Sequence, residues 1–348
     1  MVDEYLASNK PTFLITIDTE GDDLWSAPRQ ITTRNALFLP RFQALCEQYH
    51  LLPTWLTNHE MVQDPLYREF AQDLLLRDQG EIGMHLHAWN SPPLNCSLTG
   101  DDMRHHPYLI EYPEEIMAEK VRVLTASLED SFNRKMVSHR AGRWAFDQRY
   151  ARILVEHGYQ VDCSVTPHTS WQKTLGDPNG AGGSDYRHFP ERCYFMDLQA
   201  IHRPGESDLL QVPVSIRRGA SFAASAMLQR WESRGTIAAL GVRVIRRLWP
   251  ETRWLRPNGR NLSSMRTILD EILARREPYA ELMLHSSELM PDGSPTFRTA
   301  RQIDALYDDL EQLFAVAADR FIGRTLAGFY SHVQQLFPDK TKRETLFR

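Results

Sequence analysis

The sequence predicts a single α/β domain in which parallel strands alternate with helices, arranged most simply as a barrel. Short apolar segments rich in β-branched and aromatic residues recur along the chain, helical apolar patterns separate them, and several segments end in a charged or imidazole side chain. Such segments are typical of strands buried in a parallel sheet. We find no internal repeat and no long linker. We therefore expect a tail over 1–11, one barrel domain over 12–322, and a C-terminal helix and tail over 323–348.

The first half of the chain shows the alternation most clearly. Residues 12–18 predict a buried strand that delivers Asp18 at its end, and residues 80–87 predict a strand that carries His85 and His87. Apolar residues recur at helical spacing between these strands and after them. The expected strands are 12–18, 51–56, 80–87 and 137–140, and the expected helices are 37–49, 65–77, 117–132 and 146–157.

The second half predicts fewer regular elements, around a long loop. Residues 166–187 are rich in Pro, Gly, Ser and Asp and have no core pattern, so we expect an excursion over the surface or over the site, as a lid or a rim. The last predicted strand, 280–284, leads into His285. The other expected elements are strands at 159–165 and 209–216 and helices at 237–248, 263–277, 303–317 and 324–337.

Size and charge limit the class of protein. The chain has 348 residues and a mass of 40.3 kDa, which is enough for a large core. With 40 Lys and Arg against 45 Asp and Glu, it has no basic excess to bind nucleic acid or an anionic membrane surface. No window approaches the ~20 apolar residues of a transmembrane helix, and Asp3 and Glu4 stand where a signal peptide carries positive charge. The cysteines form no CxxC pair, which favours a reduced, cytoplasmic setting.

Polar side chains gather at the expected C-terminal ends of strands, where parallel sheets and barrels place their active sites. His85 and His87 are two residues apart and share one face of a strand, which suits a metal site because neutral imidazole is a common metal ligand. A carboxylate from Asp18 or Glu20 would complete a site with open positions for water and a substrate carbonyl. His285 could protonate a leaving nitrogen. This donor set predicts a metal-assisted hydrolase.

The order of these polar motifs resembles that of the polysaccharide deacetylase family, which has the NodB homology domain and is also described as carbohydrate esterase 4-like. The resemblance extends from residue 12 to about 320, and within the family the sequence looks most like the divergent WalW-type branch from polysaccharide or lipopolysaccharide gene clusters. The segments that match the family's motifs are 17–22, 81–87, 139–144, 162–167 and 282–285.

The resemblance implies a distorted (β/α) barrel of the NodB type that holds one divalent metal ion, with zinc expected and cobalt, manganese or nickel as alternatives. It implies catalytic residues, metal ligands and substrate contacts along the strand ends. The catalytic residues would be Asp18 as base, Arg140 as the residue that orients it and His285 as general acid; the metal ligands would be Glu20, His85 and His87; and the candidate substrate contacts are Trp89, Trp144 and Asp162.

The residues themselves leave alternatives open. Asp18, Glu20 and Asp22 are all candidates for the metal carboxylate, Arg140 could serve a structural ion pair, and the tryptophans and Asp162 could be core residues. The family pattern commonly has Asp-Asp and His-x-x-x-His, whereas this chain has Trp89 at the second histidine position and His87 as the expected replacement.

The expected function is removal of an N-acetyl or related acyl group from a sugar in polysaccharide or lipopolysaccharide metabolism. One alternative is an amidase of the same fold that acts on a non-sugar amide. Another is a catalytically silent carbohydrate-binding protein. We expect a carbohydrate or glycoconjugate substrate, no nucleic-acid partner and no membrane span, and we leave the oligomeric state open.

Overall fold

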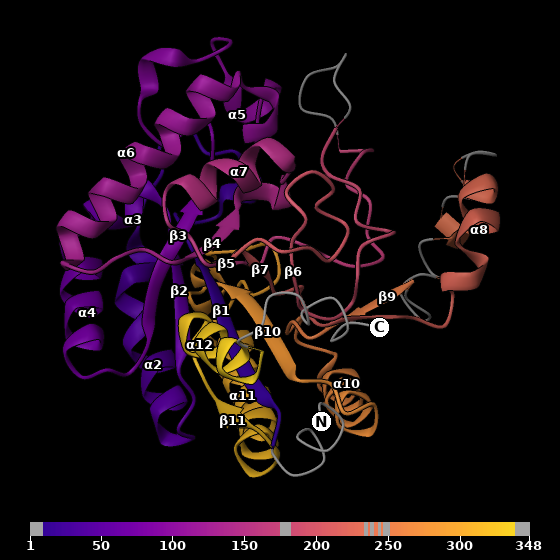
Figure 1. Cartoon of the computed structure of the whole chain (residues 1–348). Coiled ribbons are helices and arrows are strands. Elements are labelled where there is room, and N and C mark those ends of the chain that lie inside the picture. Colours follow the sequence, from indigo (N-terminus) through magenta and orange to yellow (C-terminus); the bar gives the residue numbers. More distant parts are fainter. Residues whose placement is uncertain are drawn as a thin grey trace.

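A curled sheet of mainly parallel strands forms the centre of the structure (Figure 1). The computed structural model describes residues 10–174, 182–232 and 251–337, and also 236, 240–242 and 245. The strands of the sheet are β1 (Thr12–Thr19), β2 (Pro53–Thr57), β3 (Glu81–Leu86), β4 (Ser138–Ala141), β5 (Val161–Asp162), β6 (Tyr194–Phe195), β7 (Leu210–Gln211), β10 (Tyr279–His285) and β11 (Ile322–Gly323). Their order is β10-β1-β2-β3-β4-β5-β7-β6 with β11 beside β1, and among these pairs only β6 and β7 run antiparallel.

The open side of the curl is bridged by short segments. β8 (Ile216–Arg218) and β9 (Thr252–Trp254) form a separate antiparallel pair. Leu255, directly after β9, accepts a hydrogen bond from the N–H of Met283 in β10 at 3.2 Å, and its own N–H donates to the carbonyl of Ser215 at 2.9 Å. Because these contacts replace a continuous ladder, the structure is a distorted (β/α) barrel in a single domain, which confirms the predicted fold class.

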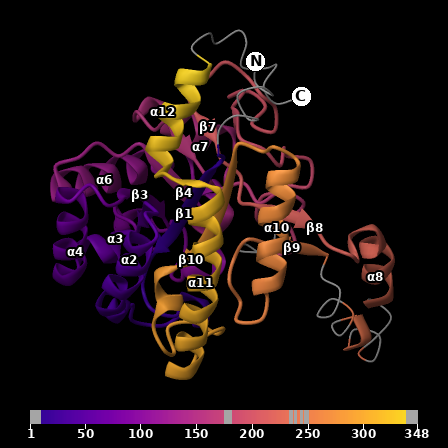
Figure 2. The ribbon, with the colours of Figure 1, turned by 90° about the horizontal axis from the view of Figure 1, so that it is seen from below.

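Helices cover the outside of the curled sheet (Figures 1 and 2). The apolar stripe predicted from Met117 to Phe132 is buried in α6, and the stripe from Ile303 to Ala317 is buried in α11. α8 stands away from the sheet in both views. The α-helices are α2 (Leu39–Gln48), α3 (His59–Gln63), α4 (Pro65–Leu76), α5 (Asp102–His105), α6 (Glu114–Phe132), α7 (Gln148–Glu156), α8 (Ser225–Glu232), α10 (Leu262–Ala274), α11 (Ala300–Arg320) and α12 (Leu326–Leu336).

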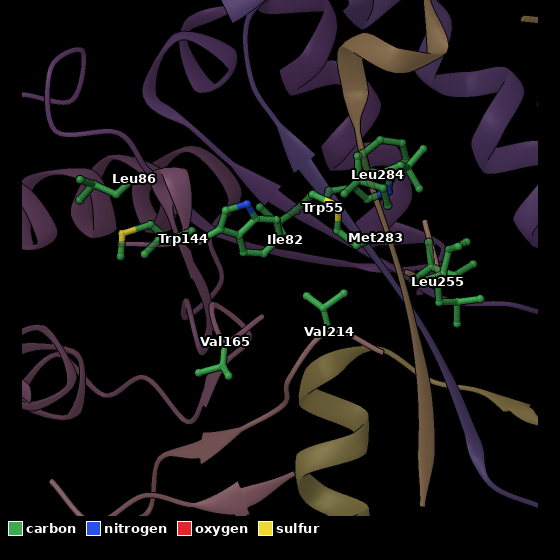
Figure 3. Packing of buried hydrophobic residues seen from close by; sticks show 14 of the residues in the cluster. Trp55, Ile82, Leu86, Trp144, Val165, Val214, Leu255, Met283 and Leu284 are labelled. Atoms are coloured by element: carbon green, nitrogen blue, oxygen red, sulfur yellow. The ribbon is translucent and has the colours of Figure 1, made fainter. Parts of the chain in front are cut away.

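Side chains of β1 alternate between two apolar clusters, as the two-residue period of a strand requires. Phe13, Ile15 and Ile17 belong to the main cluster, whereas Leu14 belongs to a smaller cluster that includes Phe329 of α12. Figure 3 shows part of the main cluster, where side chains from β2, β3 and β10 meet those from the segments after β5 and β7. Full burial of a large apolar side chain stabilises the fold by about 1.5–3 kcal/mol. The even-numbered residues of β1, including Asp18, therefore lie on the same face of the strand as Leu14.

α12 packs at the end of the sheet where β2 and β3 begin. The Glu81 carboxylate accepts hydrogen bonds from the N–H of Ala327 at 2.9 Å and from the Thr54 hydroxyl at 3.1 Å. The Thr54 hydroxyl in turn accepts from the N–H of Leu326 at 3.0 Å. A carboxylate at the positive N-terminal end of a helix is electrostatically favourable. Phe329 and neighbouring apolar residues of α12 pack against Leu14 and Leu56 of the sheet.

The structure differs from the sequence-based expectations mainly in the second half. The strand expected over 209–216 is divided into β7 and β8 around Pro213, which has no N–H to donate to a ladder. The strand expected over 159–165 is only β5, and β6, β9, β11, α3, α5 and α8 had not been expected. The helix expected over 237–248 lies largely outside the described residues. None of the described helices is long and apolar enough to cross a membrane.

Candidate metal and catalytic site

The strand register brings the predicted site residues together. β1 pairs with β10 so that Asp18 lies opposite His285, and β3 pairs with β4 so that His85 lies opposite Arg140. Glu20 directly follows β1. All five are at the C-terminal ends of parallel strands, where unpaired positions and loops give side chains access to a ligand. The fold therefore brings these five residues together at one edge of the sheet.

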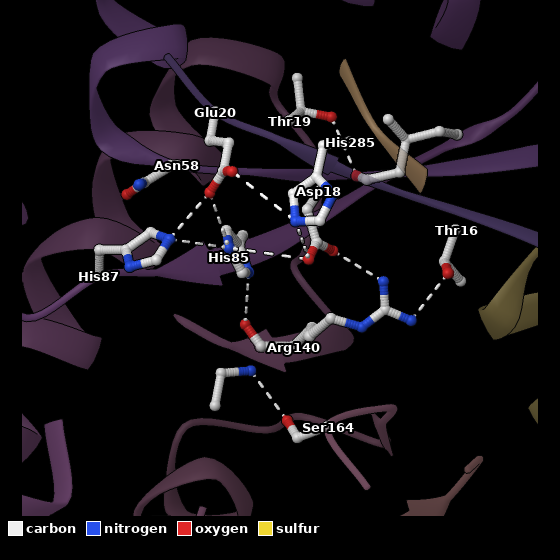
Figure 4. A network of polar contacts seen from close by, with 12 residues as sticks. Thr16, Asp18, Thr19, Glu20, Asn58, His85, His87, Arg140, Ser164 and His285 are labelled. Carbon is white, nitrogen blue, oxygen red and sulfur yellow. Dashed lines mark hydrogen bonds and ion pairs between the residues drawn. The ribbon is translucent and has the colours of Figure 1, made fainter. Parts of the chain in front are cut away.

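Glu20, His85 and His87 form a compact cluster that could hold a metal ion. The Oε2 atom of Glu20 lies 2.8 Å from Nε2 of His87 and 3.3 Å from Nε2 of His85, and the two Nε2 atoms are 3.2 Å apart (Figure 4). All three side chains are buried. His87 lies just beyond the end of β3, but the chain stays extended enough for both imidazoles to face the same point.

Hydrogen bonding identifies which imidazole nitrogen of His85 is free for a ligand. Nδ1 of His85 lies 2.9 Å from the backbone carbonyl of Arg140, and because a carbonyl can only accept, Nδ1 carries the proton. Nε2 is therefore the nitrogen that points into the cluster, toward Glu20 and His87. Two imidazole nitrogens and a carboxylate that converge on one point suit a divalent cation such as zinc, so these residues fit the metal that the motifs imply.

Gly142 makes room for His87. A side-chain carbon at position 142 would lie 2.7 Å from Nδ1 of His87 and 2.6 Å from the carbonyl of Leu86. Neither contact leaves space for a methyl group, so glycine is required for the imidazole to stand where it does. Nδ1 of His87 is buried and has no hydrogen-bond partner among the described residues. Packing against Gly142 therefore positions the Nδ1 side of this ring, whereas its Nε2 atom contacts Glu20.

Arg140 forms a buried ion pair with Asp18. Nη1 of Arg140 donates to Oδ1 of Asp18 at 2.7 Å, Nη2 donates to the hydroxyl of Thr16 at 2.7 Å and lies 2.5 Å from Oε1 of Glu281, and Nε donates to the carbonyl of Cys163 at 3.1 Å. The guanidinium is fully buried. A buried charge of this kind requires paired carboxylates, and here Asp18 and Glu281 supply them.

The electrostatics keep the site carboxylates ionised. Burial alone would raise the pKa of Asp18, but the Arg140 guanidinium and the nearby histidines outweigh it, so the pKa lies below its usual value. Burial likewise opposes ionisation of Glu20, and hydrogen bonds from His85 and His87 hold its pKa well below the usual value. Both carboxylates are therefore charged at neutral pH. Two negative charges beside two imidazoles favour a cation in the cluster.

His285 faces the cluster from β10 and is held by residues that sequence reasoning missed. Its Nε2 atom lies 3.7 Å from Oδ2 of Asp18 and 3.8 Å from Oε1 of Glu20. The buried Glu288 carboxylate accepts from the N–H of His285 at 2.9 Å and lies 3.3 Å from its Nδ1, and Arg256 pairs with Glu288 at 3.0 Å. Despite burial, Arg256 and His285 lower the pKa of Glu288 to about 2. The only sequence signal for Glu288 is its position three residues after His285.

A cavity of about 300 Å³ opens above these groups. The predicted substrate contacts Trp89 and Trp144 line it, and so do Trp25 and Trp171, which gives the cavity walls of aromatic rings. Trp171 belongs to the loop predicted as a lid or rim, so the described part of that loop borders the site. Arg143 also lines the cavity, and both it and Trp144 have positive φ angles, of 53° and 61°. Such conformations in non-glycine residues often occur at functional sites.

Asp162 and Asp22 lie elsewhere. Asp162 is fully buried and is not among the residues that line the cavity. It lies 2.7 Å from Nδ1 of His139 and accepts from the N–H of Ser164 at 2.9 Å, so it ties β5 to β4 beneath the site. The structure thus does not bring this predicted substrate contact to the cavity. Asp22 accepts from the N–H groups of Arg34 and Asn35 at 3.0 Å, so it organises a loop and is not part of the cluster.

These observations define an α/β protein with a metal-type donor set at the C-terminal ends of a distorted barrel. A search of solved structures finds a "putative polysaccharide deacetylase" from Mycobacterium smegmatis, with a TM-score of 0.53 and 12% identity over 94% of this chain and 92% of that one. The likeness shows a shared fold, and it agrees with the NodB-type barrel that the motifs predicted.

A second solved structure shares the fold at a similar level. It is a 4-alpha-glucanotransferase from Thermococcus litoralis, with a TM-score of 0.52 and 12% identity over 93% of this chain. The matched part is 40% of that protein. No protein-family model matches the chain, and no curated protein does. Because these two structures share a fold but carry different names, the chemistry has to be argued from the site itself.

Proposed function

We propose that the protein is a metal-dependent hydrolase that removes an N-acetyl or related acyl group from a sugar of a polysaccharide or lipopolysaccharide. The observation that carries this proposal is the convergence of Glu20, His85 and His87 beside an Asp18 whose second oxygen faces His285. The name of the Mycobacterium smegmatis structure supports the same reaction. We also propose that the protein is cytoplasmic and that its domain limits are those expected from the sequence.

Each residue has a separate task in this chemistry. Glu20, His85 and His87 would hold one divalent ion, with zinc proposed first. Bound there, the ion would lower the pKa of a water molecule and polarise a substrate carbonyl. Asp18 is ionised, and its Oδ2 atom is free of Arg140, so it can accept a proton from water. Nε2 of His285 approaches from the other side and can donate a proton to the leaving nitrogen.

The walls of the cavity favour a sugar. Trp25, Trp89, Trp144 and Trp171 surround it, and the apolar faces of sugar rings stack on aromatic side chains while their hydroxyls bind polar groups. An amidase acting on a non-sugar amide would use the same donor set, so the tryptophans are what favour a carbohydrate over a general amide.

A glycosyl-transfer reaction fits the site less well. Such reactions generally need one free carboxylate as nucleophile or base and a second carboxyl group that is protonated, with a raised pKa. Here the pKa values of Asp18 and Glu20 are both lowered, Asp18 is bound to Arg140, and Glu20 faces both imidazoles. The carboxylates of this site therefore favour hydrolysis of an acyl group over glycosyl transfer.

Metal content and acetate release together test the proposal. The purified protein, loaded with zinc and freed of excess metal, should carry about one equivalent of zinc in elemental analysis and should release acetate from N-acetylated oligosaccharides. The His85→Ala variant should lose both properties, whereas the matched variant at exposed His188, His188→Ala, should keep both. Full acetate release by His85→Ala would refute the proposal. A metal-free protein that binds glycans would instead favour a silent carbohydrate-binding role.

A further inference from the structure

A second and larger cavity, of about 890 Å³, lies beside the candidate site. It is formed by β9, the loop that follows it and the start of α10. Neither the donor cluster nor the proposed reaction uses it. Its lining includes Arg253, Trp254, Arg256, Asn258, Arg260 and Asn261.

The two cavities adjoin each other. Arg256 lines both of them. Glu288 lines the second cavity and contacts His285 of the first. The rings of Trp144 in the first cavity and Trp254 in the second are 6.2 Å apart in an edge arrangement. The two cavities therefore share a wall at Arg256, directly beside His285.

The lining of the second cavity is positively charged, although the whole protein has a formal net charge of −5. Three arginines line it, against Glu288 as its one carboxylate among the described residues. Arg253 is paired with Glu271 at 2.7 Å and Arg256 with Glu288 at 3.0 Å. Arg260 is exposed, and its guanidinium makes no ion pair or hydrogen bond to any part of the chain that the structure describes. One positive charge is thus left for a ligand.

The loop that carries Arg256 and Arg260 is held in place by its own hydrogen bonds. Oδ1 of the Asn258 side chain accepts from the N–H of Arg260 at 3.0 Å. Oδ1 of Asn261 accepts from the N–H of Asn258 at 2.9 Å, and Nδ2 of Asn261 donates to the carbonyl of Arg256 at 2.8 Å. A preorganised loop loses little conformational entropy when a ligand binds. The guanidinium groups are therefore displayed by a fixed backbone.

We propose that the second cavity binds a negatively charged sugar residue of the same glycan whose acyl group reacts in the first cavity. The inference deepens the proposed function and rests on it. Arginine suits this task because its planar guanidinium donates paired hydrogen bonds to carboxylate or phosphate oxygens. Trp254 supplies an apolar ring face beside these charges. The substrate is then an anionic glycan chain that spans both cavities, rather than a neutral one.

Binding measurements with two tetrasaccharides of equal length test this inference. One probe is the hyaluronan tetrasaccharide, which alternates glucuronate with N-acetylglucosamine, and the other is the neutral N-acetylglucosamine tetramer. Dissociation constants are measured by isothermal titration calorimetry with the zinc-loaded full-length protein and two variants. Arg260→Gln removes the free charge of the cavity. Arg266→Gln makes the same change at an exposed position of α10 outside the cavity lining.

We expect the wild-type protein to bind the charged probe more tightly than the neutral one. The Arg260→Gln substitution should raise the dissociation constant of the charged probe about five- to tenfold and change that of the neutral probe less than twofold. Arg266→Gln should change neither. Equal affinities for the two probes, no binding of the charged probe, or equal losses in both variants would each overturn the inference. Acetate release distinguishes this inference from the proposed function. If the protein releases acetate but binds both probes equally, only the role of the second cavity is refuted. If it binds the charged probe selectively but releases no acetate, only the proposed reaction is refuted.

Discussion

Arg140 binds one oxygen of Asp18 and leaves the other free. Nη1 of Arg140 lies 2.7 Å from Oδ1, whereas Oδ2 lies 4.0 Å from Nε2 of His85 and 3.7 Å from Nε2 of His285. The carboxylate is thereby fixed in orientation, and its free oxygen faces the point on which the imidazoles converge. This division of the two oxygens separates the task of Asp18 from that of the neighbouring Glu20.

The Asp18→Asn variant should separate catalysis from metal binding. Because Asp18 is outside the donor cluster of Glu20, His85 and His87, the variant should still bind about one equivalent of zinc. Its rate of acetate release should fall by at least about 100-fold, since an amide cannot accept the proton of water. The measurement is elemental analysis in parallel with acetate release. Loss of zinc would instead identify Asp18 as a ligand.

Replacement of Arg140 by methionine should destabilise the fold strongly. The change leaves the buried carboxylates of Asp18 and Glu281 without their counter-ion, which costs about 3–5 kcal/mol in comparable cases. Urea unfolding followed by circular dichroism measures the free energy of unfolding. Arg122, an exposed arginine paired only with Glu119, provides the matched control, and its replacement by methionine should leave stability unchanged. Similar losses in both variants would contradict the structural role of Arg140.

Glu60 should make stability depend on pH. Burial raises its pKa from 4.5 to about 7, so between these values the folded state binds more protons than the unfolded state. By linkage, the contribution of Glu60 is fully present below pH 4.5 and is lost as the pH rises through about 7. The Glu60→Gln variant has no carboxyl group at this position, so its stability does not fall with the ionisation of residue 60. Its stability relative to the wild-type protein, measured by urea unfolding in EDTA, should therefore rise by about 1–2 kcal/mol between pH 5 and pH 8, with solvent screening of the half-buried group included.

Gly142→Ala should weaken metal binding although Gly142 is not a ligand. The added methyl group would meet Nδ1 of His87 at 2.7 Å and push the imidazole out of the cluster. Loss of a well-placed ligand contact should lower zinc affinity about 10- to 100-fold, as for other changes around metal ligands. A competition titration with a zinc-binding dye measures this. Gly100→Ala is the control because a methyl group there would have no neighbour within 4 Å, and equal affinities in the two variants would count against a role of His87 in the cluster.

The fold was largely predictable because its signals are local. The apolar strand before Asp18 and the long helical stripe from Met117 to Phe132 fix β1 and α6, and the polar side chains at strand ends locate the site. The same-face argument for His85 and His87 also holds in space, although His87 lies beyond the end of β3. Short strands such as β6 were not predictable, since two residues carry no periodic pattern and depend on their neighbours.

The remaining parts of the site depend on contacts between distant segments. Arg256 and Glu281 reach the site from different elements, and nothing in their own neighbourhood of sequence marks them. Asp162 shows the opposite case, because its motif predicted a substrate contact while its carboxylate is used by His139 and Ser164 inside the fold. Which polar residue of a strand reaches the cavity depends on strand length and register, and these are set by the whole sheet.

The pairing of Asp18 with His285 also fixes when the site can form during synthesis. β1 and β10 are neighbours in the sheet but are separated by most of the chain, so β1 has an unpaired edge until β10 has left the ribosome. Until then Arg140 lacks its contact with Glu281, and Asp18 lacks its strand neighbour His285. The donor cluster and the segment up to Gly142 that positions it can therefore form before β10 is synthesised, whereas the proposed reaction also needs His285 from the last quarter of the chain.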